Sequence, residues 1–208
     1  MPFTQETIHL TNVEIHLMYF NAYNSSEYLD QLTEPEKERY FTFIHEKRRM
    51  EFVATRILRH RLFGFQHIHY DPHGAPYIED EGFISISHAP GVVGLAISKQ
   101  FKVGLDLEVI RDKAALVAHK FLSSEERQIF DIHSAIEMTK VWSAKEVLYK
   151  LAGRKQILFS EHLLLNKSTE DLWKGTIVNP DRILRTDLQL ILKNDLIITV
   201  NPTACENG

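Results

Sequence analysis

The sequence predicts an α+β protein made of two similar halves. Strand-like and helix-like segments alternate in both halves of the 208 residues, without a long linker or a low-complexity segment. The 44% hydrophobic content is enough to bury a core, as one domain or as two halves of about 100 residues each. The last quarter of the chain reads as strands of an antiparallel sheet. We therefore expect halves at 1–98 and 99–208.

The N-terminal half is expected to contain an opening strand region, two helices and a strand pair. Residues 8–20 read as the strand region, and Thr33 with Glu36 forms a capping-box pattern that starts a short helix. A longer helix is predicted through "EKRRMEFVATRILRHRLFG", ending at Gly64, because a residue without a Cβ suits a helix end. The turn-rich "DPHGAPYI" follows, and "ISISHAPGVVGLAIS" predicts two strands around a Pro-Gly turn.

The C-terminal half is expected to start with a strand and continue with helices. "FKVGLDLEVI" is the strand, Ser123 and Glu126 form a second capping box, and residues 134–153 form a long helix. The segments "ILFSEHLLL", "LWKGTIV", "ILRTDLQLILK" and "LIITV" then predict an antiparallel sheet.

Composition and charge exclude several classes of protein. No run approaches the roughly 20 apolar residues of a membrane span, and "MPFTQETIHL" has no secretion-signal pattern, so we expect a cytoplasmic protein. The single cysteine, Cys205, excludes a disulfide framework and a cysteine-based zinc site. The eleven histidines show no metal-binding spacing, and a net charge of -4 argues against nucleic-acid binding by the whole surface.

Two carboxylates stand in the strand "VGLDLEV". Alternate residues of a strand share a face, so Asp106 and Glu108 are neighbours on the face opposite Leu105 and Leu107. Two adjacent, partly buried anions repel each other unless a cation lies between them. Oxygen ligands favour Mg²⁺, with Mn²⁺ as a second possibility. The alternative is a solvated strand face with ordinary surface salt bridges.

The long helix at 134–153 carries a second set of polar residues. Its core-facing arc is formed by Ala144, Val147, Leu148 and Leu151. A different arc holds Trp142, Glu146 and Lys150, at i, i+4 and i+8. Taken singly, Glu146 and Lys150 are a routine helix pair and Trp142 is a packing residue. Together with the strand carboxylates, they offer what a metal-bound diphosphate needs, a metal ligand and a positive charge.

In order along the chain, "HGAPYI", "ISISHA", "VGLDLE", "FLSSEE" and "VWSAKEVLYK" resemble the elements of one known family. The sequence is similar to the Sfp-type 4'-phosphopantetheinyl transferases, whose pattern is roughly G-K-P, F-N-[IV]-S-H-S, G-[IV]-D-[IV]-E, F-[FL]-[ST]-x-x-E and W-[ST]-x-K-E-[AS]-x-x-K. The match covers residues from about 48 to 155, half of the chain.

The resemblance implies a fold, a reaction and partners. The fold is two structurally similar α+β halves that form a pseudo-dimer within one chain, so we expect a monomer. The reaction transfers 4'-phosphopantetheine from coenzyme A, with Mg²⁺, to a serine of an acyl carrier protein or peptidyl carrier protein domain and converts it from the apo to the holo form. Neither a nucleic acid nor a membrane is implied as a partner.

The resemblance also implies roles for individual residues. Asp106, Glu108 and Glu146 are the implied Mg²⁺ ligands, Glu146 is also the general base, and Lys150 contacts the diphosphate. Ser87 and His88 are placed at the phosphates of coenzyme A, and Gly74 with Pro76 at the adenine. Three departures from the family pattern affect the implied coenzyme A site: Ala75 replaces Lys, Ser85 replaces Asn and Ala89 replaces Ser.

The helix at 47–63 carries arginines opposite its apolar arc. Arg48, Arg49, Arg56 and Arg59 share this side, and we expect them to be exposed as a basic stripe. Such a stripe is usually a solvated face, but in an acidic protein it suits the 3'-phosphate of coenzyme A or an acidic partner. Arg48 and Arg56 are the residues we assign to coenzyme A.

Two other functions remain open from the sequence. A Mg²⁺-dependent nuclease or phosphodiesterase carries a strand Asp followed by E-x-K, although "SAKEVLYK" reads as helix rather than strand. A non-catalytic module that binds coenzyme A or a carrier is the other alternative. The intact Asp106, Glu108, Glu146 and Lys150 argue against it, but the three altered positions leave it open. The sequence does not indicate which carrier protein or pathway is served, or whether acylated coenzyme A is accepted.

Overall fold

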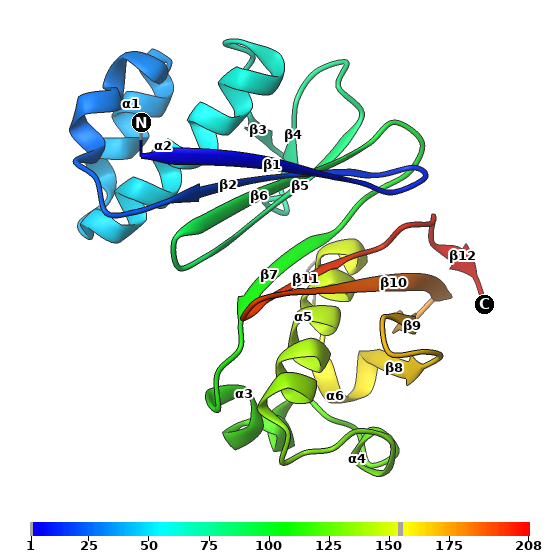
Figure 1. Cartoon of the computed structure of the whole chain (residues 1–208). Helices are drawn as coiled ribbons and strands as arrows, with labels where there is room; N and C mark the ends of the chain where they lie inside the picture. Colours follow the sequence, from blue (N-terminus) through cyan, green and yellow to red (C-terminus); the bar gives the residue numbers. More distant parts are fainter. Residues whose placement is uncertain (1, 154–155) are drawn as a thin grey trace.

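The computed structural model describes residues 2–153 and 156–208 and contains two antiparallel β-sheets, each packed against a long helix (Figure 1). The predicted α+β class is confirmed. The first sheet is formed by strands between residues 3 and 98, and the second by strands between residues 105 and 207. Within the described residues, none of the helices has the length and hydropathy of a membrane span.

The first sheet has the strand order β1-β2-β6-β5-β4-β3. Its strands are β1 (Phe3–His9), β2 (Glu14–Phe20), β3 (His69–Tyr70), β4 (Pro76–Tyr77), β5 (Phe83–Ala89) and β6 (Val92–Ser98). The connections carry a 3₁₀ helix, η1 (Ser25–Gln31), and the helices α1 (Glu34–Thr42) and α2 (Glu46–Phe63). Helix α2 packs on β2 and β6 and ends at Gly64, where a positive φ of 64° suits glycine.

The second sheet has the order β7-β11-β10-β9-β8, and β12 pairs with β10. Its strands are β7 (Leu105–Val109), β8 (Leu163–Lys167), β9 (Leu172–Val178), β10 (Ile183–Lys193), β11 (Leu196–Val200) and β12 (Glu206–Asn207). The helical elements are α3 (Lys113–Leu116), η2 (Ala118–Lys120), α4 (Glu126–Ile129), α5 (Ala135–Ala152) and α6 (Phe159–His162). Helix α5 crosses the sheet and contacts β7, β8, β9, β10 and β11.

Three apolar clusters hold these layers together. One lies between α2 and the first sheet, and another between α5 and the second sheet. The third joins the two sheets and contains side chains from both, including Leu17 on β2, Leu105 and Leu107 on β7, and Ile198 on β11. In Figure 1, β7 therefore lies at the junction of the two halves, with the first half above it and α5 below.

Most elements expected from the sequence are present. The Pro-Gly turn joins β5 to β6, and α5 begins after the N-cap Ser134 and ends at Gly153, as predicted. One expectation was wrong, because "ILFSEHLLL" does not form a single strand. Its middle forms α6, where the backbone N–H of Leu158 donates to Nδ1 of His162, and β8 begins only at Leu163.

Candidate active site

Strand β7 presents two carboxylates toward α5. Leu105 and Leu107 point into the cluster between the sheets, whereas Asp106 and Glu108 lie on the opposite face. Gly104 precedes the strand, and a Cβ at this position would lie 3.0 Å from both the carbonyl oxygen and Cγ1 of Val147. Glycine therefore allows β7 to approach α5 this closely without a tight contact between a side chain and the helix.

Asp106 is buried, with 6% of its surface exposed. Its Oδ1 accepts hydrogen bonds from Oγ of Ser87 on β5 (3.2 Å) and from Nζ of Lys150 on α5 (3.3 Å). Its Oδ2 is buried and has no hydrogen-bond partner within the residues that the structure describes. Because buried carboxylate oxygens are normally paired, this oxygen is available to a ligand.

Glu108 is less buried and has different partners. Its Oε1 accepts a hydrogen bond from Nε1 of Trp142 (3.1 Å), and Nη2 of Arg111 lies 4.0 Å from its Oε2. Burial, followed by the negative charge of Asp106, raises the pKa of Glu108, against the opposing effects of Trp142, Arg111 and Lys150. The repulsion expected between the two strand carboxylates is thus present, and a cation at this point would relieve it.

Helix α5 places the remaining predicted residues opposite β7. Nζ of Lys150 donates to the carbonyl oxygen of Leu105 as well as to Asp106, and Trp142 bonds to Glu108 two turns earlier. Glu146 is half-buried and lies one turn from each of them, so it occupies the same flank of the helix.

The acidic residues fit a hard cation only in part. Among the described residues, no group of three or more His, Cys, Asp or Glu side chains is arranged to hold a metal ion. Mg²⁺ is commonly bound by one or two carboxylates and completed by water and substrate phosphates. Asp106, through its unpartnered Oδ2, and Glu108 therefore fit such a partial site, and the assignment of Glu146 as a third ligand stays a prediction.

A basic hollow adjoins Glu108. The cavity has a volume of about 590 Å³, and Lys47, Arg48, His88 and Arg111 are among the residues that line it. Nη1 of Arg48 donates to Nε2 of His88, which leaves the proton of a neutral His88 on Nδ1, 3.6 Å from Oε2 of Glu51. Partial burial lowers the pKa of His88, with smaller contributions in the same direction from the charges of Arg48 and Lys150, against the opposing charges of Glu51 and Asp106.

A second hollow has a volume of about 220 Å³ and borders Lys150. Its lining includes Pro76, Ser85, Lys102 and Lys150. The loop that forms one wall is shaped by Asp71, whose Oδ1 accepts hydrogen bonds from the N–H groups of residues 73 and 75 (2.8 Å each). Gly74 belongs to this loop and has a φ of 81°, which a glycine adopts without strain.

The C-terminal half of the chain matches a known protein family. Residues 102–195 match the family model of the 4'-phosphopantetheinyl transferase superfamily. This segment therefore carries a domain of this superfamily. The matched segment contains both carboxylates of β7 and the whole of α5. A search of curated proteins found no match.

The match identifies this segment as a transferase domain of the phosphopantetheinyl type. The superfamily moves phosphopantetheine from coenzyme A to carrier proteins. The two hollows therefore border residues that the sequence assigns to a metal, Glu108, and to a diphosphate, Lys150.

The expectation of an exposed four-arginine stripe was wrong. Arg56 and Arg59 are buried, with 4% and 0% of their surface exposed, and both bind Glu36 of α1 (3.2 and 2.7 Å). Arg56 also stacks on Phe52, with its Cζ 3.9 Å from the ring centre. These contacts give Arg56 a structural role in the transferase, and we no longer assign it to coenzyme A. Arg48, in contrast, lines the basic hollow.

Ser87 lies at Asp106, where its Oγ donates to the carboxylate and accepts from the N–H of Leu107 (3.1 Å). Ser85, which stands where the family usually has Asn, accepts from the N–H of Leu105 (2.9 Å). The two serine hydroxyls therefore accept hydrogen bonds from the backbone N–H groups on the edge of β7 that faces the first sheet. A contact of Ser87 with coenzyme A stays a prediction.

Sequence reasoning missed a buried ion pair in the transferase. Nζ of Lys145 lies 2.6 Å from Oε2 of Glu126, and both residues are nearly inaccessible to solvent. The signal was present, because Glu126 belongs to "FLSSEE" and Lys145 to "SAKE", two of the elements that carry the family resemblance. Neither element indicates from sequence alone that the two charges meet.

Proposed function

We propose that this chain is an Sfp-type transferase that moves 4'-phosphopantetheine from coenzyme A to a serine of an acyl carrier protein or peptidyl carrier protein domain, with Mg²⁺. The observation that carries the proposal is the buried, unpartnered Oδ2 of Asp106, next to Lys150 and on the same face of β7 as Glu108. Lys150 borders one hollow and Glu108 borders another. The halves 1–98 and 99–208 act as one pseudo-dimer, and the protein is a cytoplasmic monomer.

Asp106 and Glu108 are the residues that would hold the metal, with Glu146 as a third ligand in this proposal. A bound Mg²⁺ supplies positive charge to the diphosphate oxygens. The raised pKa of Glu108 and the proximity of Asp106 are consistent with a site designed for a cation.

The chain's own residues perform the remaining steps. Glu146 accepts the proton of the carrier serine while the serine Oγ forms a bond to the phosphorus that bears the pantetheine arm. The bond from that phosphorus to the bridging oxygen breaks, and 3',5'-adenosine bisphosphate leaves. Lys150 balances the charge that builds on the leaving group. Arg48 and His88, which line the basic hollow, bind the 3'-phosphate, and the loop of Gly74 and Pro76 holds the adenine.

The nuclease alternative is disfavoured by the backbone. In the nuclease pattern, the E-x-K residues usually lie on a strand adjacent to the strand Asp. Here Glu146 and Lys150 lie on helix α5 instead. The non-catalytic binding module remains distinguishable by experiment.

The test incubates the protein with an apo carrier, coenzyme A and Mg²⁺ and measures the intact mass of the carrier. We expect the carrier to gain one phosphopantetheine group with wild-type protein and none with Asp106→Ala, whose circular dichroism spectrum should be unchanged. A carrier of unchanged mass with every carrier class tried would contradict the proposal. Cleavage of added nucleic acid would favour the nuclease, and coenzyme A binding without a mass change would favour the binding module.

A further inference from the structure

Trp142 lies beside the carboxylate pair, and the proposed reaction gives it no task. Its Nε1 donates a hydrogen bond of 3.1 Å to Oε1 of Glu108. Glu108 stands near the end of β7 and is half-buried, and its flexible side chain borders two cavities, of about 330 and 590 Å³. A carboxylate in such open surroundings needs a fixed partner to keep one orientation.

The indole ring itself is held on two sides by aromatic side chains. Phe159 stacks on it with ring centres 5.4 Å apart and an interplanar angle of 26°, and Phe121 meets it edge-on at 5.4 Å. Such arrangements are favourable for aromatic pairs and restrict the ring to one plane. The direction of the Nε1–H group is therefore set by packing.

The lysine of the buried ion pair holds the backbone of both of these aromatic residues. Nζ of Lys145 donates to the carbonyl oxygens of Phe121 (2.6 Å) and Phe159 (2.9 Å), in addition to its bond with Glu126. A charged donor at 0% exposure makes strong, directional bonds. Lys145 thus ties the two segments that clamp the indole to helix α5, which carries Trp142 itself.

We propose that Trp142 is a positioning residue that orients Glu108 for the metal ion, and that the contacts from Glu126 through Lys145 to Phe121 and Phe159 support it. This inference rests on the proposed function, because Glu108 is a metal ligand only in that reading. It also explains why a tryptophan and a lysine stand three residues apart in "WSAK": one aims at Glu108, and the other secures the ring.

The chain offers a matched control. Trp173, the second of its two tryptophans, is fully buried, and its Nε1 has no hydrogen-bond partner within the described residues. Trp142→Phe and Trp173→Phe therefore both replace an indole by a phenyl ring, but the first change alone removes a donor from Glu108.

The measurement is Mn²⁺ binding in the presence of coenzyme A and without carrier, followed by the electron paramagnetic resonance signal of free Mn²⁺. We expect Trp142→Phe to weaken Mn²⁺ binding by about tenfold or more, because loss of a partner that orients a metal ligand typically costs about 10–100-fold. Trp173→Phe should bind Mn²⁺ as the wild type does. Equal binding by wild type and Trp142→Phe would overturn the inference alone. A wild-type protein that binds no Mn²⁺ would overturn the proposed function, and the inference with it.

A second measurement holds even if Trp142→Phe does not fold. In ¹⁵N-labelled Trp173→Phe protein, the remaining indole N–H signal belongs to Trp142. We expect this signal to shift when Mg²⁺ is added with coenzyme A, and to shift when Glu108→Gln is introduced. A signal that responds to neither change would show that the indole does not sense Glu108, and would overturn the inference.

Discussion

Removing the charge of Lys145 should destabilise the protein strongly. Lys145→Met keeps a side chain of similar length but leaves the carboxylate of Glu126 buried without its cation. Two backbone carbonyl oxygens, those of Phe121 and Phe159, lose their donor as well. Glu126 keeps its bonds from the N–H groups of Ser123 and Leu165 (2.8 Å each), which offset part of the loss.

The magnitude follows from the burial of both partners. The side chains of Lys145 and Glu126 are 0% and 2% exposed, so solvent does not screen the charge that is left. Breaking such a pair from one side costs about 3–5 kcal/mol. For a chain of this size, that corresponds to a fall in Tm of about 6–20 °C. Lys145 is thus expected to contribute much more to the free energy of unfolding than an ordinary surface lysine does.

The assay is urea unfolding followed by tryptophan fluorescence. Lys145→Met should lower the midpoint while the dependence on urea stays the same, which identifies a change in stability rather than in the unfolded state. Adding Glu126→Gln to Lys145→Met should recover part of the loss, because it removes the uncompensated charge.

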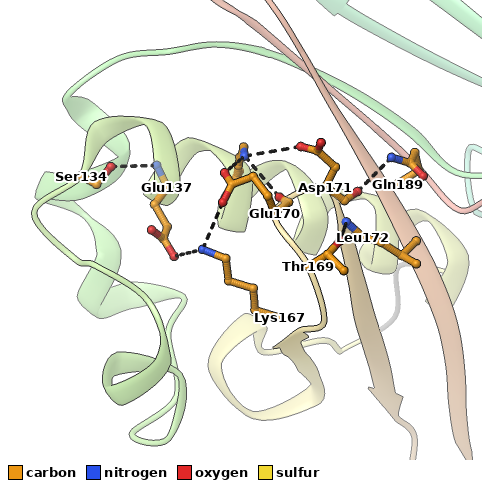
Figure 2. Close-up of polar contacts among 9 residues, drawn as sticks. Ser134, Glu137, Lys167, Thr169, Glu170, Asp171, Leu172 and Gln189 are labelled. Carbon is orange, nitrogen blue, oxygen red and sulfur yellow. Dashed lines mark hydrogen bonds and ion pairs between the residues drawn. The ribbon is translucent and has the colours of Figure 1, made fainter.

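Lys140 provides the comparison on the same helix. Figure 2 shows the polar contacts around Glu170 and Asp171, in the turn between β8 and β9. Nζ of Lys140 lies 2.6 Å from Oε1 of Glu170, which is itself 71% exposed and can be hydrated when the lysine is removed. Lys140→Met should therefore lower the midpoint much less. Equal midpoints for Lys140→Met and Lys145→Met would refute the reasoning, as would a loss below about 1 kcal/mol for Lys145→Met.

Three further predictions concern the N-terminal half. In steady-state kinetics, Arg48→Ala should raise the KM for coenzyme A more than for its analogue without the 3'-phosphate. In urea unfolding, Arg56→Ala should lower the free energy of unfolding by about 1.5–3 kcal/mol, because it leaves buried Glu36 with one partner fewer. The reverse pattern would contradict both predictions. Because partial burial lowers the pKa of His88 in the folded state, the unfolded state binds the proton more tightly, and stability should fall as the pH drops through about 6.5. His88→Gln should show a smaller fall between about pH 7.5 and 5.5, and identical pH slopes in unfolding experiments would exclude this role of His88.

The sequence predicted the elements that local rules determine. Ser134 and Gly153 delimit α5 because a side-chain acceptor and a left-handed residue are local requirements of helix ends. The alternation in "VGLDLEV" predicted that Asp106 and Glu108 lie opposite the apolar side chains of β7, and the structure confirms this. The positions of these carboxylates needed no knowledge of the remaining chain.

Contacts between distant segments were not predictable in this way. The buried positions of Arg56 and Arg59 depend on Glu36, which a separate helix brings to them across 20 and 23 residues. Periodicity assigned both arginines to the polar side of α2 but did not indicate that α1 covers this side. Lys145 is a comparable case, because a buried lysine is recognisable only with its partner, 19 residues away.

The most direct test of the site compares Glu146→Gln and Lys150→Ala in steady-state transfer to a carrier, across concentrations of Mg²⁺ and coenzyme A. We predict that Glu146→Gln lowers kcat by about 10² or more and is only partly rescued by Mg²⁺, because the base is not restored. Lys150→Ala should weaken coenzyme A binding as well as turnover. Glu137→Gln, on the same helix, removes the negative charge from a contact of 3.2 Å with Lys167 (Figure 2) and should leave the kinetics unchanged. Wild-type kinetics for both Glu146→Gln and Lys150→Ala would contradict the assignment of this flank of α5 to the reaction.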